Sequence, residues 1–509
     1  MRKNNLKTKL RASARYLVEA SPLGPFFFWR YQNGPLNSAC KIGRREGWRK
    51  AVDWVLESPT KGPLVDKKAH SALENKLTCL TEVELLLTEF RKTLTLERIE
   101  KLDNPDVQRF CCALIRHLIN NEYVFYVSPE EYDKLAKISL DFELLATGEA
   151  SEIRNLLVRL MYKPPSEVLD DKIALDSFAR LPPFLKALIA DALSDFREEQ
   201  RIKENVTVIA KPQRDTARKV AKQYEENPYP RWISISLPEP KSRLNYLRQF
   251  FSENELSFSD QPFDILVPGC GTGQRAIQWA VAYGKNARVL AIDLSRSSLA
   301  YGIRKARELG VQNIDFAQAD FNELDTTRKF HIVECTGVVH HTENPLQSCK
   351  SLVDLTLPGG LVHVSLYSEL SRRSIVKVRN EAGIDANYLA ENKVDSDYIR
   401  AKRYEMLIKT PEMVLNELPL REDFFDLSRC RDLLFNEVEH RFTIPQISAM
   451  IEEHGLEFRG FEDPQLLRDK FWSFYPKGKD RLNLEKWWEF EKKHPMIFRE
   501  LYEIWSLKV

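Results

Sequence analysis

A short glycine-rich stretch constrains the fold of this chain more than any other feature. Residues 263–274 read FDILVPGCGTGQ, in which the apolar run 265–267 predicts a buried strand that Pro268 ends. Glycines at 269, 271 and 273 follow, and then apolar residues at helical spacing. Strand, glycine turn and helix in this order are typical of an α/β sheet that binds a nucleotide-like ligand at the carboxyl end of its first strand. Glycine is needed there because the backbone turns tightly and comes close to the ligand.

Two acidic residues follow at the ends of the next predicted strands. Asp293 ends the apolar run 289–292, where a carboxylate is placed to bind ribose hydroxyls. Asp320 ends the next strand-like run, and a Leu-Pro-Gly-Gly turn follows at 357–360. In this order and spacing, the residues resemble the class I S-adenosylmethionine (SAM) dependent methyltransferases over about residues 264–367.

The resemblance implies a SAM site of known layout. In that family the glycine loop meets the methionine part of SAM, the first acid meets the ribose and the second meets the adenine. Backbone groups after the fourth strand also approach the methionine part. The residues of this sequence at those positions are Gly269, Cys270, Gly271, Thr272, Gly273, Asp293, Leu294, Asp320, Phe321, Thr336 and Gly337.

Two residues depart from the family pattern. Val267 stands where many members have an acid that helps to hold the SAM amino group, and His331 stands where an Asp usually opens the fourth strand. The fold prediction is unaffected. Both departures leave open a protein that keeps the SAM fold as a scaffold and transfers no methyl group.

The candidates for acid–base chemistry lie after the fourth and fifth predicted strands. His340 and His341 resemble the paired histidines of many small-molecule methyltransferases, and either one could act as a base. Alternatively, one histidine packs against the sheet and the other caps a turn. Tyr367 and Arg372 lie at the same sheet edge, where they could bind an anionic substrate or cap the segment that follows.

An aromatic and proline-rich segment, NPYPRW at 227–232, precedes the glycine loop. It is either a domain linker or a flap over the SAM pocket, with Tyr224, Tyr229 and Arg231 as its contact residues. The segment resembles a bacterial family that joins an N-terminal helical, often tetratricopeptide-type, region to a methyltransferase domain. Residues 121–125, 431–435 and 440–443 resemble further segments of the same family.

Taken together, the patterns predict an α/β Rossmann-like doubly wound sheet with an N-terminal all-α domain, a helical insertion and a C-terminal helical tail. The predicted parts are a basic and aromatic extension at 1–60, an all-helical domain at 64–205, a linker and flap at 210–257, the SAM-binding core at 258–370, a helical lid at 371–440, the last helix and strand of the core at 441–464, and an aromatic helical tail at 465–509.

Composition adds limits on partners and compartment. Residues 1–60 hold twelve Lys/Arg against four Asp/Glu, which is typical of a solvated helix end or of a nucleic-acid, membrane-surface or targeting arm. No apolar run reaches membrane-spanning length. The eight cysteines and nine histidines have no metal-site spacing, so we expect no metal, a reducing compartment and a cytoplasmic location, with organelle targeting as the alternative.

The expected function is SAM-dependent methyl transfer to an unidentified acceptor, with a protein or other bulky molecule favoured by the helical regions on both sides of the sheet. A small phenol or quinone-like acceptor is the close alternative. A nucleic-acid acceptor is disfavoured because the sequence after the fourth strand, 334–337, lacks the proline-aromatic motif that stacks a flipped base.

Overall fold

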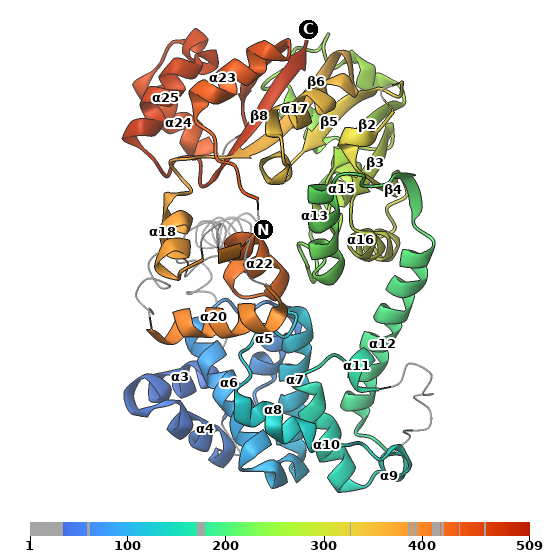
Figure 1. Cartoon of the computed structure of the whole chain (residues 1–509), viewed down its shortest axis with the longest axis vertical. Helices are drawn as coiled ribbons and strands as arrows, with labels where there is room; N and C mark the ends of the chain where they lie inside the picture. Colours follow the sequence, from blue (N-terminus) through green and yellow to red (C-terminus); the bar gives the residue numbers. More distant parts are fainter. Residues whose placement is uncertain are drawn as a thin grey trace, which may run out of the picture. The chain divides into compact units, whose positions relative to one another are not determined.

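The computed structural model describes residues 34–58, 62–169, 178, 180–325, 327–384, 388–389, 394–409, 418, 422–436, 438–462 and 465–509. These residues divide into two compact units (Figure 1). The first comprises residues up to 197 together with 391–435, and the second comprises 198–390 and 436–509. The predicted extension at 1–60 lies outside the described residues up to position 33.

The first unit is all-helical. Its helices are α3 (Gly34–Glu46), α4 (Trp48–Glu57), α5 (Lys67–Asn75), α6 (Thr81–Leu96), η1 (Ile99–Asp103), α7 (Pro105–Asn120), α8 (Pro129–Ala136), α9 (Phe142–Thr147), α10 (Ala150–Leu160), α11 (Pro165–Val168), α12 (Pro183–Glu204, which runs on into the second unit), α20 (Ser396–Lys409), η6 (Glu422–Phe424) and α22 (Leu427–Phe435). The leucine, valine and phenylalanine side chains of α6, α7 and α10 supply much of its buried core.

Proline and a capping side chain begin several of these helices, as the sequence predicts. The Asn104 side chain accepts hydrogen bonds from the first-turn amides of α7, and Pro105 follows it. Ser128 forms a capping box with Glu131 at the start of α8. Each cap satisfies amide groups that a helix start leaves without partners.

The predicted lid at 371–440 divides between the two units. Its first part belongs with the sheet, whereas α20 and α22 pack with the N-terminal helices. A buried ion pair fixes this arrangement, because Nη1 and Nη2 of Arg403 both donate to the carboxylate of Glu84 on α6. Arg400 also donates to the Tyr123 carbonyl oxygen at 2.6 Å. Residues more than 270 positions apart in the sequence thus share one core.

The second unit is built on an eight-stranded sheet in the order β1-β4-β3-β2-β5-β6-β8-β7. Its strands are β1 (Thr207–Ala210), β2 (Phe263–Pro268), β3 (Ala287–Asp293), β4 (Ile314–Ala319), β5 (Phe330–Cys335), β6 (Thr356–Tyr367), β7 (Leu456–Phe461) and β8 (Leu501–Lys508). Strands β1 to β6 run parallel, and β8 is antiparallel to both of its neighbours. The chain order reverses between β2 and β5, which is where open α/β sheets bind ligands at their carboxyl ends.

Helices cover both faces of this sheet. They are α13 (Asp215–Glu226), α14 (Ser242–Leu247), η3 (Ser257–Asp260), α15 (Gln274–Tyr283), α16 (Arg296–Glu308), η4 (Phe321–Glu323), η5 (Val339–His341), α17 (Pro345–Asp354), α18 (Arg373–Glu381), α23 (Ile444–Glu453), α24 (Gln465–Phe474), η7 (Gly478–Leu482) and α25 (Leu484–Lys493). Alternate β2 residues divide between two apolar cores, since Leu266 packs with α17, α23 and α25 while Ile265 and Val267 pack with α14 and α15.

The predicted Rossmann-like fold is confirmed, with one difference in the C-terminal tail. Helices α24 and α25 form as expected, but residues 501–508 are strand β8 and not helix. The Trp505 ring on β8 is fully buried, stacks on His363 at 4.6 Å and donates to Glu462 at 2.7 Å. A strand forms here because it fills the space between β6 and β7 and pairs with both.

The predicted linker and flap at 210–257 contains two helices, α13 and α14. Strand β1 begins just before this segment and is an edge strand beside β4. Among the described residues, no helix is long and apolar enough to cross a membrane. Within the same residues, no group of three or more His, Cys, Asp or Glu side chains is arranged to hold a metal ion.

Candidate functional site

The glycine loop joins the end of β2 to α15 and needs its glycines for two reasons. Gly269 and Gly271 have φ angles of 61° and 54°, a region that disfavours residues with a side chain. A Cβ atom at Gly271 would also overlap the carbonyl oxygen of Tyr229, and one at Gly269 would overlap Val338. The loop is therefore closed in by two segments that leave room for backbone alone.

Asp293 at the end of β3 is hydrogen-bonded to this loop. Its Oδ2 accepts from the Gly271 amide at 2.8 Å, and its Oδ1 accepts from the Ser295 amide at 2.9 Å. Burial raises the pKa of Asp293 to about 6, although the two backbone donors oppose the rise. Each carboxylate oxygen has a second lone pair, so the group can still accept hydrogen bonds from a ligand.

The NPYPRW segment packs directly on the glycine loop. The Thr272 amide donates to the Tyr229 carbonyl oxygen at 3.1 Å, and the Thr272 hydroxyl donates to that of Pro230. The Trp232 indole donates to the Thr272 carbonyl oxygen at 3.4 Å. These contacts hold the segment against the loop, and its role as a flap stays a prediction.

The other flap residues lie near the same loop. The Tyr224 and Tyr229 ring centroids are 6.0 Å apart, and the Tyr224 carbonyl oxygen accepts from the Ser295 hydroxyl at 2.9 Å. The guanidinium of Arg231 lies 5.2 Å from the centroid of the Tyr301 ring. The structure thus brings Tyr224 and Tyr229 to the Asp293 region and places Arg231 against α16.

Asp320 is engaged by a residue that the sequence analysis did not identify. Its Oδ2 accepts from Arg214 at 2.9 Å, and the same guanidinium lies 3.6 Å from Glu323. Asp320 also accepts from the Asn322 amide at 3.0 Å, which caps η4 beside the buried Phe321. The predicted adenine acid is therefore paired with a cation in this structure.

Three other predicted cofactor residues differ in whether their polar groups already have hydrogen-bond partners. The Gly337 amide donates to the Ser365 hydroxyl at 2.8 Å, and the Leu294 carbonyl oxygen accepts from Gln318 at 2.8 Å. The Thr336 hydroxyl is buried and has no hydrogen-bond partner among the described residues. An orphaned buried hydroxyl beside the glycine loop's strand is consistent with a polar ligand.

His340 is fully buried in an aromatic stack. Its ring lies 3.7 Å from the Tyr367 ring, centroid to centroid, and the guanidinium of Arg372 lies 3.8 Å from the centroid of the same ring. Two planar groups this close to one centroid must lie on opposite faces of the ring. Burial lowers the pKa of His340 well below its ordinary value, and the neighbouring His341 and Arg372 add to the effect. His340 is therefore neutral near pH 7, and its role as a base stays a prediction.

His341 and Arg372 are held by groups from the segment 436–442 and from the C-terminal tail. The Nδ1 atom of His341 lies 2.7 Å from the Val438 carbonyl oxygen. Arg372 donates to Glu439 at 2.8 Å and to Glu500 at 2.5 Å. Two carboxylates thus already neutralise the charge of Arg372, and the prediction that it binds an anionic substrate stays untested.

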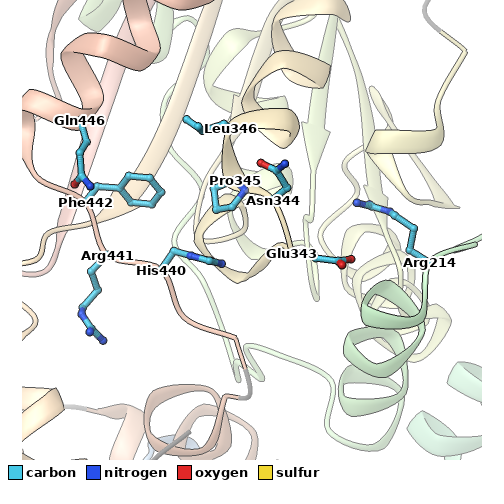
Figure 2. A pocket seen from close by; sticks show the side chains of 9 residues that line it. All are labelled: Arg214, Glu343, Asn344, Pro345, Leu346, His440, Arg441, Phe442 and Gln446. Carbon is cyan, nitrogen blue, oxygen red and sulfur yellow. The ribbon is translucent and has the colours of Figure 1, made fainter.

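A pocket of about 680 Å³ opens at the carboxyl edge of the sheet (Figure 2). Residues from three segments line it: Arg214 after β1, Glu343, Asn344, Pro345 and Leu346 after η5, and His440, Arg441, Phe442 and Gln446 beside the end of β6. The His440 amide donates to the His340 carbonyl oxygen at 2.8 Å, and that of Phe442 to the Tyr367 carbonyl oxygen at 2.8 Å. These bonds fix the segment 440–442 beside the predicted histidine loop.

Residues 440–443 resemble a family segment, but the sequence alone indicates no site role for them. The signal that could have found them is the run His-Arg-Phe-Thr just before a proline-started helix, α23. Burial lowers the pKa of His440, so that the ring is neutral near pH 7. Unlike His340, His440 faces a pocket.

Residues 265–360 match the model of a family described as a methyltransferase domain. An uncharacterized protein of Synechococcus sp. is 28% identical over 233 residues, which are 44% of this chain and 54% of that protein. The ubiquinone biosynthesis O-methyltransferase of Rickettsia conorii is 31% identical over 141 residues, 28% of this chain and 47% of that protein. The chain thus spans about half the length of these curated relatives.

Among solved structures, PKMT2 from Rickettsia typhi in complex with AdoHcy is 16% identical, covers 53% of this chain and 54% of its own, and has a TM-score of 0.35. Magnesium protoporphyrin IX methyltransferase from Synechocystis with bound SAH is 13% identical, covers 57% of this chain and 99% of its own, and has a TM-score of 0.32.

Proposed function

We propose, from the class I SAM-dependent methyltransferase domain that this chain carries, that the protein transfers the methyl group of SAM to an acceptor. One observation carries the proposal. The hydrogen bond from the Gly271 amide to the Asp293 carboxylate sets the glycine loop beside the acid at the switch point of the sheet. A loop that admits backbone alone and a buried carboxylate with free lone pairs suit the ribose and methionine parts of SAM.

SAM supplies a methyl group that is bonded to a positively charged sulfur. The sulfur is the leaving group and needs no acid to help it leave. The chain's own work is to align the acceptor with that methyl group and to exclude water. Asp293 would accept from the ribose hydroxyls, and Asp320 would accept from the adenine amino group in competition with Arg214. Thr336 and Gly337 would approach the methionine part, while Tyr224 and Tyr229 would cover it.

We favour a protein side chain or another bulky molecule as the acceptor, since the chain carries a helical unit beyond the methyltransferase domain. A small phenol or quinone-like acceptor is the second candidate, favoured by the name of the Rickettsia conorii relative. A scaffold that transfers nothing is the third, favoured by Val267 at the usual position of an acid.

Methyl-labelled SAM separates these candidates. The purified chain is incubated with fractions of a lysate from its source cells, beside an Asp293→Ala variant that serves as the background. Label that appears in protein bands only with the unaltered chain supports the favoured acceptor class. Label in small metabolites alone rejects it in favour of the second candidate, and label with neither form rejects methyl transfer.

A further inference from the structure

The open pocket between Arg214 and the segment 440–446 has no role in the proposed cofactor site. Its lining residues follow β1 and η5 or lie in the segment 440–446, which is hydrogen-bonded to the end of β6, so the pocket is at the sheet edge where this architecture binds ligands. It adjoins the cofactor residues on two sides. Arg214 is ion-paired with Asp320, and His440 is hydrogen-bonded to the loop that contains Gly337. A molecule in this pocket would therefore lie beside bound SAM.

The charged side chains that line the pocket indicate which kind of molecule it can bind. The two arginines are already neutralised, because Arg214 pairs with Asp320 and Glu323 while Arg441 pairs with Glu369 and Glu439. Figure 2 shows the Arg441 side chain directed away from the other lining side chains.

Glu343, by contrast, is exposed and makes no ion pair within the part of the chain that the structure describes. The pocket thus presents one uncompensated negative charge.

The rest of the lining combines apolar and aromatic groups with the amide side chains of Asn344 and Gln446. Figure 2 shows the Phe442 ring directed toward Pro345 and Leu346, and the His440 ring directed toward Glu343. A carboxylate together with an aromatic face is the pairing that recognises an ammonium group, and the apolar side chains suit an alkyl stem. A negatively charged acceptor would be repelled by the carboxylate of Glu343.

Resting on the methyl transfer proposed above, we propose that this pocket binds the acceptor, that the acceptor is a primary amine on an alkyl chain, and that Glu343 and Phe442 hold it while His440 takes its proton. His440 first takes a proton from the bound ammonium group and passes it to solvent, which leaves a lone pair on the amine nitrogen. That lone pair then forms a bond to the methyl carbon as the carbon–sulfur bond of SAM breaks and its electron pair stays on sulfur, so that the product is a methylammonium group. His340 and His341 then support the loop and take no proton.

Binding comes first in the test. Saturation-transfer NMR on the full chain loaded with S-adenosylhomocysteine compares Nα-acetyl-lysine methylamide with its norleucine counterpart, which lacks the amine. We expect at least tenfold tighter binding of the lysine probe and at least tenfold weakening by Glu343→Gln, but not by Glu452→Gln on the exposed part of α23. Equal binding of the two probes, or no effect of Glu343→Gln, overturns the amine assignment.

The second experiment measures methyl transfer from labelled SAM to the same lysine probe. We expect His440→Gln to lower the transfer rate at least 50-fold with probe affinity within threefold of the unaltered chain, whereas His494→Gln in the C-terminal tail changes neither. Transfer by His440→Gln at an unchanged rate overturns the role of His440. No transfer to 10 mM probe by the unaltered chain overturns the amine acceptor.

Two controls separate the possible failures. If the unaltered chain does not bind S-adenosylhomocysteine, the proposed methyl transfer fails. If Glu343→Gln or His440→Gln abolishes that binding, the pocket belongs to the cofactor and the acceptor inference alone fails. An n-pentylamine arm distinguishes the sources of the amine, since tighter binding of the lysine probe identifies a protein acceptor and tighter binding of pentylamine identifies a small free amine.

Discussion

At the scale of single residues, Gly271 makes the sharpest steric demand on the site. We expect Gly271→Ala to weaken S-adenosylhomocysteine binding at least tenfold and to lower the free energy of unfolding by about 2–3 kcal/mol, because the new Cβ meets the Tyr229 carbonyl oxygen at a strained φ. Calorimetry and urea unfolding measure the two effects.

Gly310→Ala is the matched control for that variant. Gly310 has a φ of 70° but nothing within 4 Å of the added atom. In Gly310→Ala the backbone strain alone should lower the free energy of unfolding by about 1–2 kcal/mol. This variant should bind S-adenosylhomocysteine as tightly as the unaltered chain does. Equal losses in the two variants would mean that the packing of NPYPRW on the loop is unimportant.

The protonation of Asp293 predicts a pH dependence of cofactor binding. Its pKa of about 6 in the folded protein means that the carboxylate is lost as pH falls through 6, and ribose hydroxyls bind best to the ionised form. The affinity for S-adenosylhomocysteine should therefore rise from pH 5 to pH 7, by a factor approaching tenfold per unit below pH 6. Calorimetry across this range checks it, and a flat profile would exclude Asp293 as the ribose ligand.

The raised pKa of Asp293 has the opposite effect on the free energy of unfolding, which falls with rising pH while cofactor affinity rises. Because the folded pKa lies above the unfolded value, the folded protein without ligand holds the extra proton between about pH 4 and pH 6. Asp293 therefore contributes stability at low pH that is lost as pH rises through 6. Asp293→Asn should remove this part of the pH dependence, which chemical unfolding at pH 4.5 and pH 7 measures.

At the scale of secondary structure elements, β8 completes the sheet and predicts a strong stability effect. Trp505→Ala should cost about 3–5 kcal/mol, because it empties a fully buried site between β6 and β7 and removes the donor to Glu462. Trp488→Ala, at a half-buried position on α25, should cost less than half as much. Urea unfolding compares the two, and similar losses would contradict the placement of β8 inside the sheet.

The parallel strands could be predicted from sequence, because buried strands such as 264–267 and 330–334 are short apolar runs that end in a glycine turn or an acid. Strand β8 could not, because its aromatic residues resemble those of the helices before it, and its partners lie over 130 residues earlier in the chain or come from β7. The place of His440 in the pocket was missed for a related reason. The run 440–443 stands out in the sequence, but the hydrogen bonds from the His440 amide to the His340 carbonyl oxygen and from the Phe442 amide to the Tyr367 carbonyl oxygen join it to segments far away in the chain.

At the scale of the whole molecule, the chain leaves its helical unit within α12 and returns to it for α20 and α22. Arg403→Met should destabilise this unit by about 3–5 kcal/mol, because Glu84 is left buried without its partner. Hydrogen exchange in α6 and α20 measures the loss. The double variant Glu84→Met with Arg403→Met should recover most of it, and exchange as fast as in the single variant would show that the pair does not hold α20 in place.

The central claim is that the glycine loop and Asp293 form a working cofactor site, and calorimetric titration with S-adenosylhomocysteine tests it most directly. The account predicts micromolar binding by the unaltered chain and at least a hundredfold loss in Asp293→Ala, with circular dichroism unchanged. Equal binding by both forms, or none by the unaltered chain, would contradict it.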